Sequence, residues 1–109
     1  MQDLAFVGSS QDDIRQFPED ARREAGYQLD KVQRGEQPTD LGPMTTISSG
    51  VYEVRIKEHG DEFRVFYVTA FRDKIYVLHA FQKKSRKTSQ QDLNVGRRRY
   101  RMLKEHLQA

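Results

Sequence analysis

The sequence predicts a small α+β fold, in which an antiparallel sheet meander packs against two N-terminal helices and a C-terminal helix. Its length of 109 residues indicates a single domain, residues 1–109, because two domains of half that size would each struggle to build a core. An apolar stripe of helical period in the first third of the chain predicts the helices. From Val51 the pattern changes to alternation, which predicts the strands.

The N-terminal segment predicts a strand and then a short helix. Leu4 to Val7 is a short apolar run followed by Gly8-Ser9-Ser10, as expected of an edge or opening strand. Ser10 and Asp13 have the spacing of a capping box, and the helix that they open is predicted to run through Phe17.

A longer helix is predicted from about Glu19 to Arg34. Pro18 fits its first position, and Gly35 is a typical residue for its end. Apolar residues recur along one side at helical spacing: Ala21, Ala25, Leu29 and Val32. The segment from Glu36 to Gly50 contains two prolines and two glycines, so we expect a loop there.

Three β-rich runs follow and predict the meander: Val51 to Lys57, Glu62 to Thr69 and Lys74 to Phe81. The first run alternates, with apolar residues on one face and Glu53, Arg55 and Lys57 on the other, as in a strand with one buried side. The other two runs are apolar on both faces and fit central strands.

The end of the chain predicts a helix from about Gln90 to Leu107. Ser89 and Asp92 repeat the capping pattern at its start. Apolar or small residues then recur at helical spacing, which indicates a face that packs on the sheet: Leu93, Gly96, Tyr100, Leu103 and Leu107.

Composition excludes several classes of site. There are no cysteines, which excludes disulfides and thiolate zinc sites, and the three histidines do not have a metal-ligand spacing, so no metal and no small-molecule cofactor are expected. No apolar segment is long enough to span a bilayer, and the first ten residues lack the features of a signal peptide. We therefore expect a cytoplasmic protein that does not contact a membrane.

Charge is distributed unevenly along the chain. Up to Phe71 there are 8 Lys and Arg against 13 Asp and Glu, a net charge of −5; from Arg72 onward there are 11 against 3, a net charge of +8. A basic C-terminal third is typical of a surface that meets a polyanion, because each cation near a phosphate releases condensed counterions. A solvated basic helix without a ligand is the alternative.

The densest group of cations lies between the last strand and the last helix. Four cations fall within the five positions from Lys83 to Lys87. Such a cluster is either an exposed loop or a phosphate site, and the nearby N-terminus of the final helix favours an anion.

Two strand arginines and one histidine are the other candidates. If Arg55 and Arg64 share a face, they could grip a phosphate, or either could form a structural ion pair with Glu53. His79 lies on a strand and is either a general acid or base or a satisfied core residue. The run from Arg97 to Arg101 spreads around a helix, so its members cannot all face one ligand.

The strand and loop motifs resemble a known family. Tyr52-Glu53-Val54-Arg55, Phe63-Arg64-Val65-Phe66-Tyr67 and the block from Ile75 through His79-Ala80-Phe81-Gln82-Lys83-Lys84 to Lys87-Thr88 are similar to the phage-derived Gp49-like, or HigB-like, branch of the RelE/ParE toxin superfamily. The resemblance implies a small RelE-like sandwich and a toxin of a type II toxin-antitoxin module. It also implies a metal-independent endoribonuclease (mRNA interferase) that cleaves mRNA on the ribosome and inhibits translation.

On this reading the substrate's own 2′-hydroxyl is the nucleophile and the protein supplies cations and acid–base groups. The expected catalytic residues are Arg64, His79, Lys83 and Lys84, and the expected RNA- or phosphate-binding residues are Arg55, Lys57, Arg86, Lys87 and Arg97. The expected partners are a cognate helix-turn-helix antitoxin, the ribosome and mRNA. The alternatives are a non-catalytic nucleic-acid-binding module, a ParE-like inhibitor of DNA gyrase, and a toxin that has become inactive.

Overall fold

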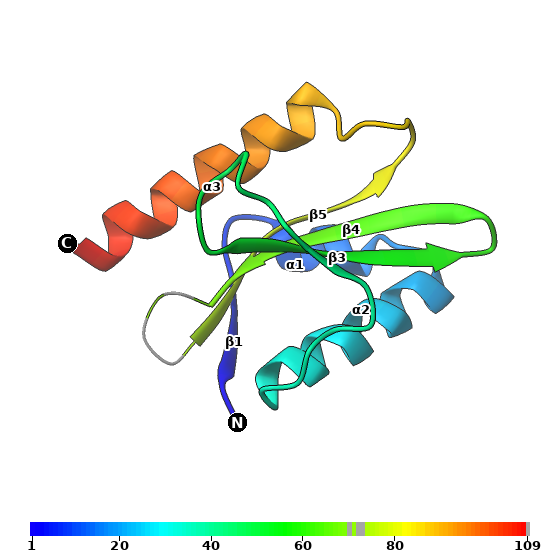
Figure 1. The fold of residues 1–109 in the computed structure, drawn as a ribbon, viewed down its shortest axis with the longest axis horizontal. Helices are drawn as coiled ribbons and strands as arrows, with labels where there is room; N and C mark the ends of the chain where they lie inside the picture. The colour runs from blue at the N-terminus through cyan, green and yellow to red at the C-terminus, as the bar shows by residue number, and fades with distance from the viewer. Residues whose placement is uncertain (70, 72–73, 109) are drawn as a thin grey trace.

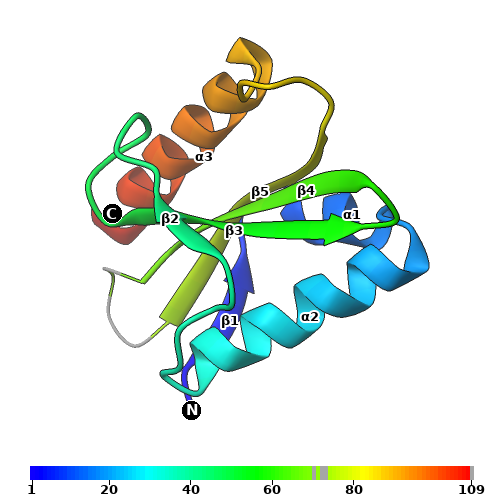
Figure 2. The same ribbon diagram turned by 45° about the vertical axis from the view of Figure 1, so that its right-hand side comes forward.

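A five-stranded sheet with helices on both faces makes up the fold (Figures 1 and 2). The computed structural model describes residues 1–69, 71 and 74–108. Its elements, in chain order, are β1 (Asp3–Phe6), α1 (Ser10–Arg15), α2 (Glu19–Gln33), β2 (Leu41–Pro43), β3 (Val51–Glu58), β4 (Asp61–Val68), β5 (Lys74–Lys83) and α3 (Gln90–Gln108).

The sheet has the order β1-β5-β4-β3-β2. Strands β3, β4 and β5 form the expected antiparallel meander, and β1 is the expected edge strand, paired in parallel with β5. The expected loop between residues 36 and 50 was wrong in one part, because Leu41–Pro43 forms β2 and pairs with β3. Three residues that include a glycine and a proline carry too little local signal to predict a strand.

The β3–β4 hairpin closes through a tight turn at His59 and Gly60. Both residues have positive φ, 54° at His59 and 83° at Gly60, as a two-residue turn that matches the twist of its strands requires. The hairpin pairs residue for residue from Val51 opposite Val68 to Glu58 opposite Asp61. Arg55 therefore lies directly opposite Arg64.

The first face of the sheet packs against α2. The apolar stripe of α2 is buried as predicted, at Ala21, Ala25, Leu29 and Val32, against one side of β3, β4 and β5. The helix ends at Gln33, one residue before the expected end, and Pro18 is its N-cap rather than its first residue.

The second face packs against α3 over part of its length only. Gly96 and Leu103 are the buried residues of α3, and its core partners include Val51, Phe66 and Val68. Figure 1 shows α3 running over one part of the sheet, away from the β3–β4 turn. The end of this face nearest that turn has no helix over it (Figure 2).

A bulge in β5 and the capping of α1 position two polar residues. The β4–β5 register moves from Phe66 opposite His79 to Tyr67 opposite Val77, so one extra residue of β5 lies between these pairs. The N-cap of α1 is Ser9 rather than Ser10. Ser10 is instead fully buried, and its hydroxyl donates to the carbonyl oxygen of Val77, 3.0 Å away.

Two further observations complete the fold. Helix α1 ends at Arg15, two residues before the expected end at Phe17. None of the described helices combines the length and apolar composition needed to cross a bilayer.

Candidate functional site

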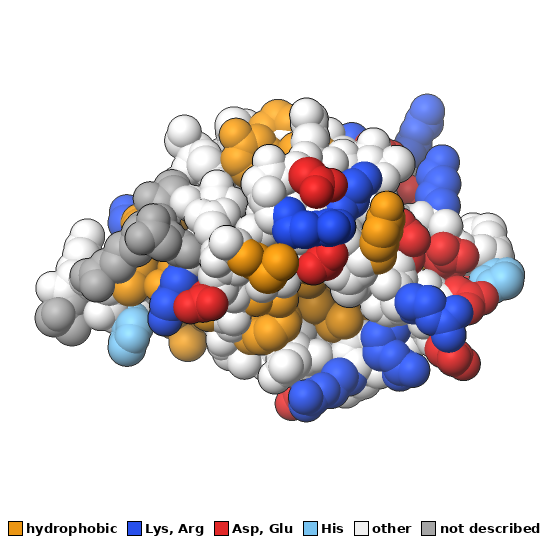
Figure 3. Space-filling model, turned by 90° about the horizontal axis from the view of Figure 1, so that it is seen from below, with side chains coloured by type: hydrophobic (Ala, Val, Ile, Leu, Met, Phe, Trp, Pro, Cys, Tyr) orange, Lys and Arg blue, Asp and Glu red, His pale blue; other side chains and the backbone are white. Residues whose placement is uncertain are grey.

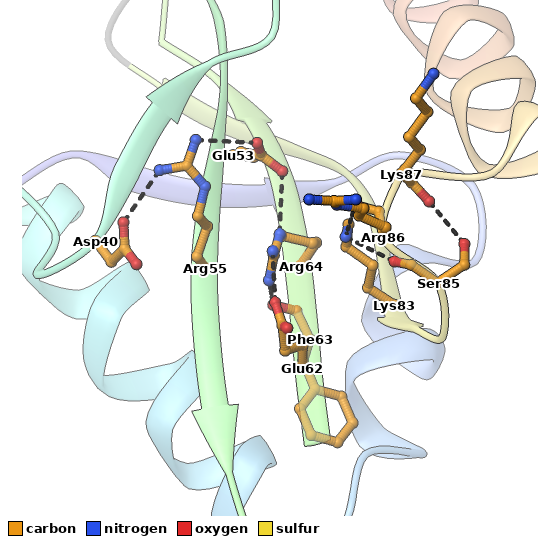
Figure 4. A network of polar contacts seen from close by, with 10 residues as sticks. All are labelled: Asp40, Glu53, Arg55, Glu62, Phe63, Arg64, Lys83, Ser85, Arg86 and Lys87. Atoms are coloured by element: carbon orange, nitrogen blue, oxygen red, sulfur yellow. Dashed lines mark hydrogen bonds and ion pairs between the residues drawn. The ribbon is translucent and has the colours of Figure 1, made fainter. Parts of the chain in front are cut away.

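The uncovered end of the sheet holds a ladder of arginines and carboxylates (Figure 4). Arg55 and Arg64 share one face of the hairpin, and Glu53 lies between them. Its two carboxylate oxygens contact both side chains: Oε2 lies 3.4 Å from Nη2 of Arg55, and Oε1 lies 3.3 Å from Nε of Arg64. The ion pair expected as one alternative is therefore present, and it involves both arginines.

Arg64 is the buried member of the ladder. Its side chain is 8% exposed, and Nη2 also lies 2.8 Å from Oε1 of Glu62, while Nη1 donates to the carbonyl oxygen of Phe63 at 3.1 Å. Oε1 of Glu53 is buried and close to Arg64 but receives no well-aligned hydrogen bond from the described residues. Arg64 thus lies beneath the surface as a source of positive charge that is held in place from three sides.

Arg55 is the more accessible member. Its side chain is 36% exposed, and Nη1 donates to Oδ1 of Asp40 at 3.1 Å. Hydrogen bonding to Asp40 raises the pKa of the Arg55 guanidinium above its ordinary value, so this residue is a permanent cation. Gly42 on β2 leaves the space that the guanidinium fills, because a Cβ at Gly42 would overlap it.

A second row of alternating charge lies next to the turn. In the strand registers Glu62 is opposite Lys57 on one side and Lys83 on the other. The hydrogen bond from Arg64 holds the pKa of the Glu62 carboxyl below its ordinary value, and the charges of Lys57 and Lys83 lower it further. Glu62 is therefore ionised and a weak base near neutral pH.

Lys83, the last residue of β5, holds the basic loop that follows the strand. Nζ of Lys83 donates to the carbonyl oxygens of Ser85, at 2.7 Å, and Arg86, and the Ser85 hydroxyl donates to the carbonyl oxygen of Lys87 at 2.8 Å (Figure 4). These hydrogen bonds within the loop fix its shape. The side chains of Lys84, Arg86 and Lys87 remain exposed.

The turn and the loop enclose a polar hollow of about 430 Å³, which we call the hairpin hollow. Its walls come from the β3–β4 turn on one side and the end of β5 with the basic loop on the other. The lining residues are Gly60, Asp61, Glu62, Gln82, Lys83, Lys84, Ser85 and Arg86.

His79 occupies a buried position between three elements. Its side chain is 10% exposed, and Nε2 lies 2.8 Å from Oδ1 of Asp92 in the first turn of α3. Nδ1 lies 3.7 Å from Oδ2 of Asp13 on α1 and has no hydrogen-bond partner among the described residues. The ring stacks on Phe81 with 4.9 Å between centroids.

Asp13 and Asp92 each have a further partner. Nη1 of Arg99 lies 3.1 Å from Oδ2 of Asp13 and also donates to the carbonyl oxygen of Leu78. Ser89 caps α3 as predicted, since its hydroxyl accepts from the backbone N–H of Asp92 at 3.1 Å. These contacts tie α1, β5 and α3 together around His79.

The predicted site residues thus fall into three groups. Around the uncovered sheet end the structure gathers Arg55, Lys57, Arg64, Lys83, Lys84, Arg86 and Lys87. His79 is buried opposite Phe66, two residues along β4 from Arg64, and contacts the first turn of α3. Arg97 lies on α3, where Nε donates to the carbonyl oxygen of Thr46 at 3.3 Å.

Glu53, Glu62, Asp13 and Asp92 complete these clusters and were not among the predicted site residues. Alternation along β3 already placed Glu53 on the face of Arg55, which was the available signal for its role. Asp13 and Asp92 were visible only as helix-capping residues. Their contacts with His79 depend on how α1 and α3 pack.

Two other features lie outside this region. A hollow of about 750 Å³ lies between β1, the start of β5 and the C-terminal half of α3, and most of its lining residues are apolar. Asp20, Glu58 and His59 place three potential ligand atoms within 4.8 Å of one another. The shortest of these contacts, 2.6 Å between Nε2 of His59 and Oδ2 of Asp20, is a hydrogen bond.

Comparison with known families identifies one family. The sequence profile of the phage-derived Gp49-like proteins (DUF891) matches residues 12–101. The chain belongs to this family. It is a family of RelE/HigB-like toxins, so the chain is a phage-derived, toxin-like protein. No curated protein matches the sequence.

Proposed function

We propose that this protein is the toxin of a type II toxin-antitoxin module and cleaves mRNA on the ribosome. The observation that carries the proposal is the open end of the sheet, where Lys83, Lys84 and Arg86 line the hairpin hollow. The ladder of Arg55 and Arg64 lies on the same sheet face and is linked to the hollow through Glu62. Membership of a toxin family supports the same reading.

The chemistry proposed here uses the substrate's own 2′-hydroxyl. That oxygen attacks the neighbouring phosphorus, the bond to the 5′ oxygen breaks, and the products are a 2′,3′-cyclic phosphate and a free 5′-hydroxyl. A base must take the 2′ proton, an acid must protonate the leaving oxygen, and cations must stabilise the extra negative charge of the phosphorane.

The exposed cations are suited to the last task. Lys84 and Arg86 line the hairpin hollow and are free to meet a phosphate. Arg55 can exchange Asp40 for a phosphate oxygen, since both residues of that pair are partly exposed. Arg64 is held by carboxylates and acts as a fixed charge from below, which needs no reorganisation during the reaction.

We assign His79 a positioning role, without direct contact with the substrate. It is buried and bonded to Asp92, so a bound RNA would reach it only after the first turn of α3 had moved. We propose that His79 anchors α3 and thereby the adjoining basic loop, and that an acid–base group comes from Lys84 in the hairpin hollow.

The burial of His79 is also the observation that favours a second candidate, a non-catalytic module that binds nucleic acid or gyrase through the same cations. The two functions differ in the fate of the message. A binder leaves it intact and shows a salt-dependent affinity, whereas a nuclease creates new 5′ ends.

The proposed partners are the ribosome with its mRNA and a helix-turn-helix antitoxin. An antitoxin for this toxin would present acidic residues wherever it covers the hairpin hollow, because charge complementarity governs such contacts.

The test is a cell-free translation reaction with purified protein, in which mRNA 5′ ends are mapped with and without ribosomes. The proposal expects new ends, with 5′-hydroxyl chemistry, only when ribosomes translate. Intact message and normal translation would contradict it, and gyrase inhibition would then be measured.

A further inference from the structure

A second basic groove runs along the outer side of α3. It has a volume of about 450 Å³ and is lined by three cations and one carboxylate: Arg97, Arg101, Lys104 and Glu105. Ile47 and Tyr100 supply apolar surface between them. We call this feature the α3 groove.

The cations of the α3 groove form one stripe. Positions 97, 101 and 104 are four and three residues apart, so they lie on the same side of the helix, one turn after another. Successive turns of an α-helix are about 5.4 Å apart. The stripe therefore presents positive charges in a row, which suits the repeating phosphates of a nucleic acid.

These cations are not neutralised within the described residues. Arg97, Arg101 and Lys104 form no ion pair with a described carboxylate, although Arg23, Arg34, Arg55, Arg64 and Arg99 all do. Figure 3 shows the contrasting α2 side of the molecule, where basic and acidic side chains lie next to one another. Like charges left close together are unfavourable unless an anion or solvent screens them.

The turn that precedes β3 forms the other wall of the α3 groove, and hydrogen bonds hold it in shape. The turn before β3 is closed by backbone hydrogen bonds from Ile47 and Ser48 to the carbonyl oxygen of Met44, at 3.0 and 3.3 Å. Ile47 packs where Gly96 has no side chain, and Arg97 donates to Thr46. The groove thus has a fixed shape between two elements that are far apart in sequence.

The α3 groove is separate from the hairpin hollow. No residue lines both features. The hollow is lined by the β3–β4 turn, the end of β5 and the basic loop, whereas the groove is lined by Ile47 and by residues of α3 from Arg97 onward. Each can therefore be altered without changing the lining of the other.

We propose that the α3 groove binds the phosphate backbone of structured RNA, apart from the strand that is cut. This rests on the proposed function, because a toxin that acts on translating ribosomes meets folded RNA around its substrate. The guanidinium groups of Arg97 and Arg101 suit phosphate oxygens, with which arginine forms paired hydrogen bonds. The groove adds affinity and orientation rather than chemistry.

The experiment measures binding without cleavage. The probe is a fluorescent 2′-O-methyl RNA hairpin, which lacks the nucleophilic hydroxyl, titrated at several salt concentrations. The variant R101Q/K104Q removes two exposed cations from the groove, and the control R22Q/R23Q removes two exposed cations from α2, on the opposite side of the sheet.

The groove variant is expected to weaken hairpin binding on the order of tenfold near 0.1 M salt and to reduce the log–log salt slope by roughly 2, one per lost phosphate contact. The control is expected to bind like the wild type. An equal loss in both variants would mean that only net charge matters, and no loss in either would mean that RNA does not use the groove; both results overturn the proposal.

Failure of this inference can be told apart from failure of the proposed function. A wild type that cuts message while the groove variant binds the hairpin normally overturns the groove and leaves the nuclease. If the wild type binds the hairpin through the groove and cuts no message, the nuclease is overturned and the groove stands. If the wild type does not bind the hairpin, the groove proposal is overturned. An acidic protein would then be the class of partner to test for the α3 groove.

Discussion

Arg55 and Arg64 lie directly opposite each other on β3 and β4, and the carboxylate of Glu53 contacts both guanidinium groups. Like charges facing each other across a strand pair are destabilising unless an anion lies between them. Glu53 fills that role from a largely buried position. Arg55 and Arg64 are therefore held in place before any substrate arrives.

Glu53→Gln is expected to destabilise the fold by on the order of 3 kcal/mol, because it leaves Arg64 buried without its central partner. Denaturant unfolding measures the change. The control is Glu36→Gln at an exposed position near Arg34, where a loss within about 0.5 kcal/mol is expected. Equal losses in the two variants would show that Glu53 is no more than a surface carboxylate.

Gly42→Ala is expected to move Arg55 without unfolding the protein. The added methyl group would overlap the Arg55 guanidinium, and this flexible side chain can shift away from Asp40. The stability cost should stay below about 1 kcal/mol, while RNA affinity falls through the lost phosphate contact. Unfolding and binding curves measured side by side check this, and an unchanged RNA affinity would argue that Arg55 does not contact the substrate.

Two helix glycines should respond in opposite directions to alanine. At Gly96 a Cβ would lie 2.6 Å from Cδ1 of Ile47 and 3.1 Å from Cδ2 of Phe66, so Gly96→Ala should cost about 1–3 kcal/mol by overpacking. Gly26 on α2 has no atom within 4 Å of the added carbon, and Gly26→Ala should stabilise by about 0.5–1 kcal/mol through helix propensity. Thermal unfolding of the pair is the check; stabilisation of both would mean that α3 does not pack closely at Gly96.

The contact between His59 and Asp20 should depend on pH. Hydrogen bonding to Asp20 raises the pKa of His59 and lowers that of Asp20. Because the folded-state pKa of His59 exceeds its unfolded value, its contribution is present in full below an unfolded pKa of about 6.5 and is lost as pH rises through the folded value. NMR titration should show the His59 pKa falling towards its ordinary value in Asp20→Asn; no change would rule out the contact.

Local patterns in the sequence predicted the helices, the three central strands and the side of β3 that carries Glu53 and Arg55. They could not predict β2, whose pairing partners are nine to thirteen positions away, or the parallel partner of β1. The same holds for the functional region. Alternation placed Glu53, Arg55 and Lys57 on one face of β3, but it left open whether Arg64 shares that face. The burial of His79 depends on its contacts with α1 and α3, which no local spacing encodes.

The cleavage rate of ribosome-bound message by Lys84→Ala tests the central claim most directly. Lys84 lines the hairpin hollow and its side chain is exposed, and Arg22→Ala at an exposed position of α2 is the control. If the open sheet end stabilises the phosphorane, the Lys84 variant should cut on the order of 10²-fold more slowly than the wild type, and the control should not. A companion variant, E53Q/R64Q, removes the buried charge pair together and should show a similar loss while remaining folded. Cleavage at the wild-type rate by both would contradict the assignment of this surface as the site of reaction.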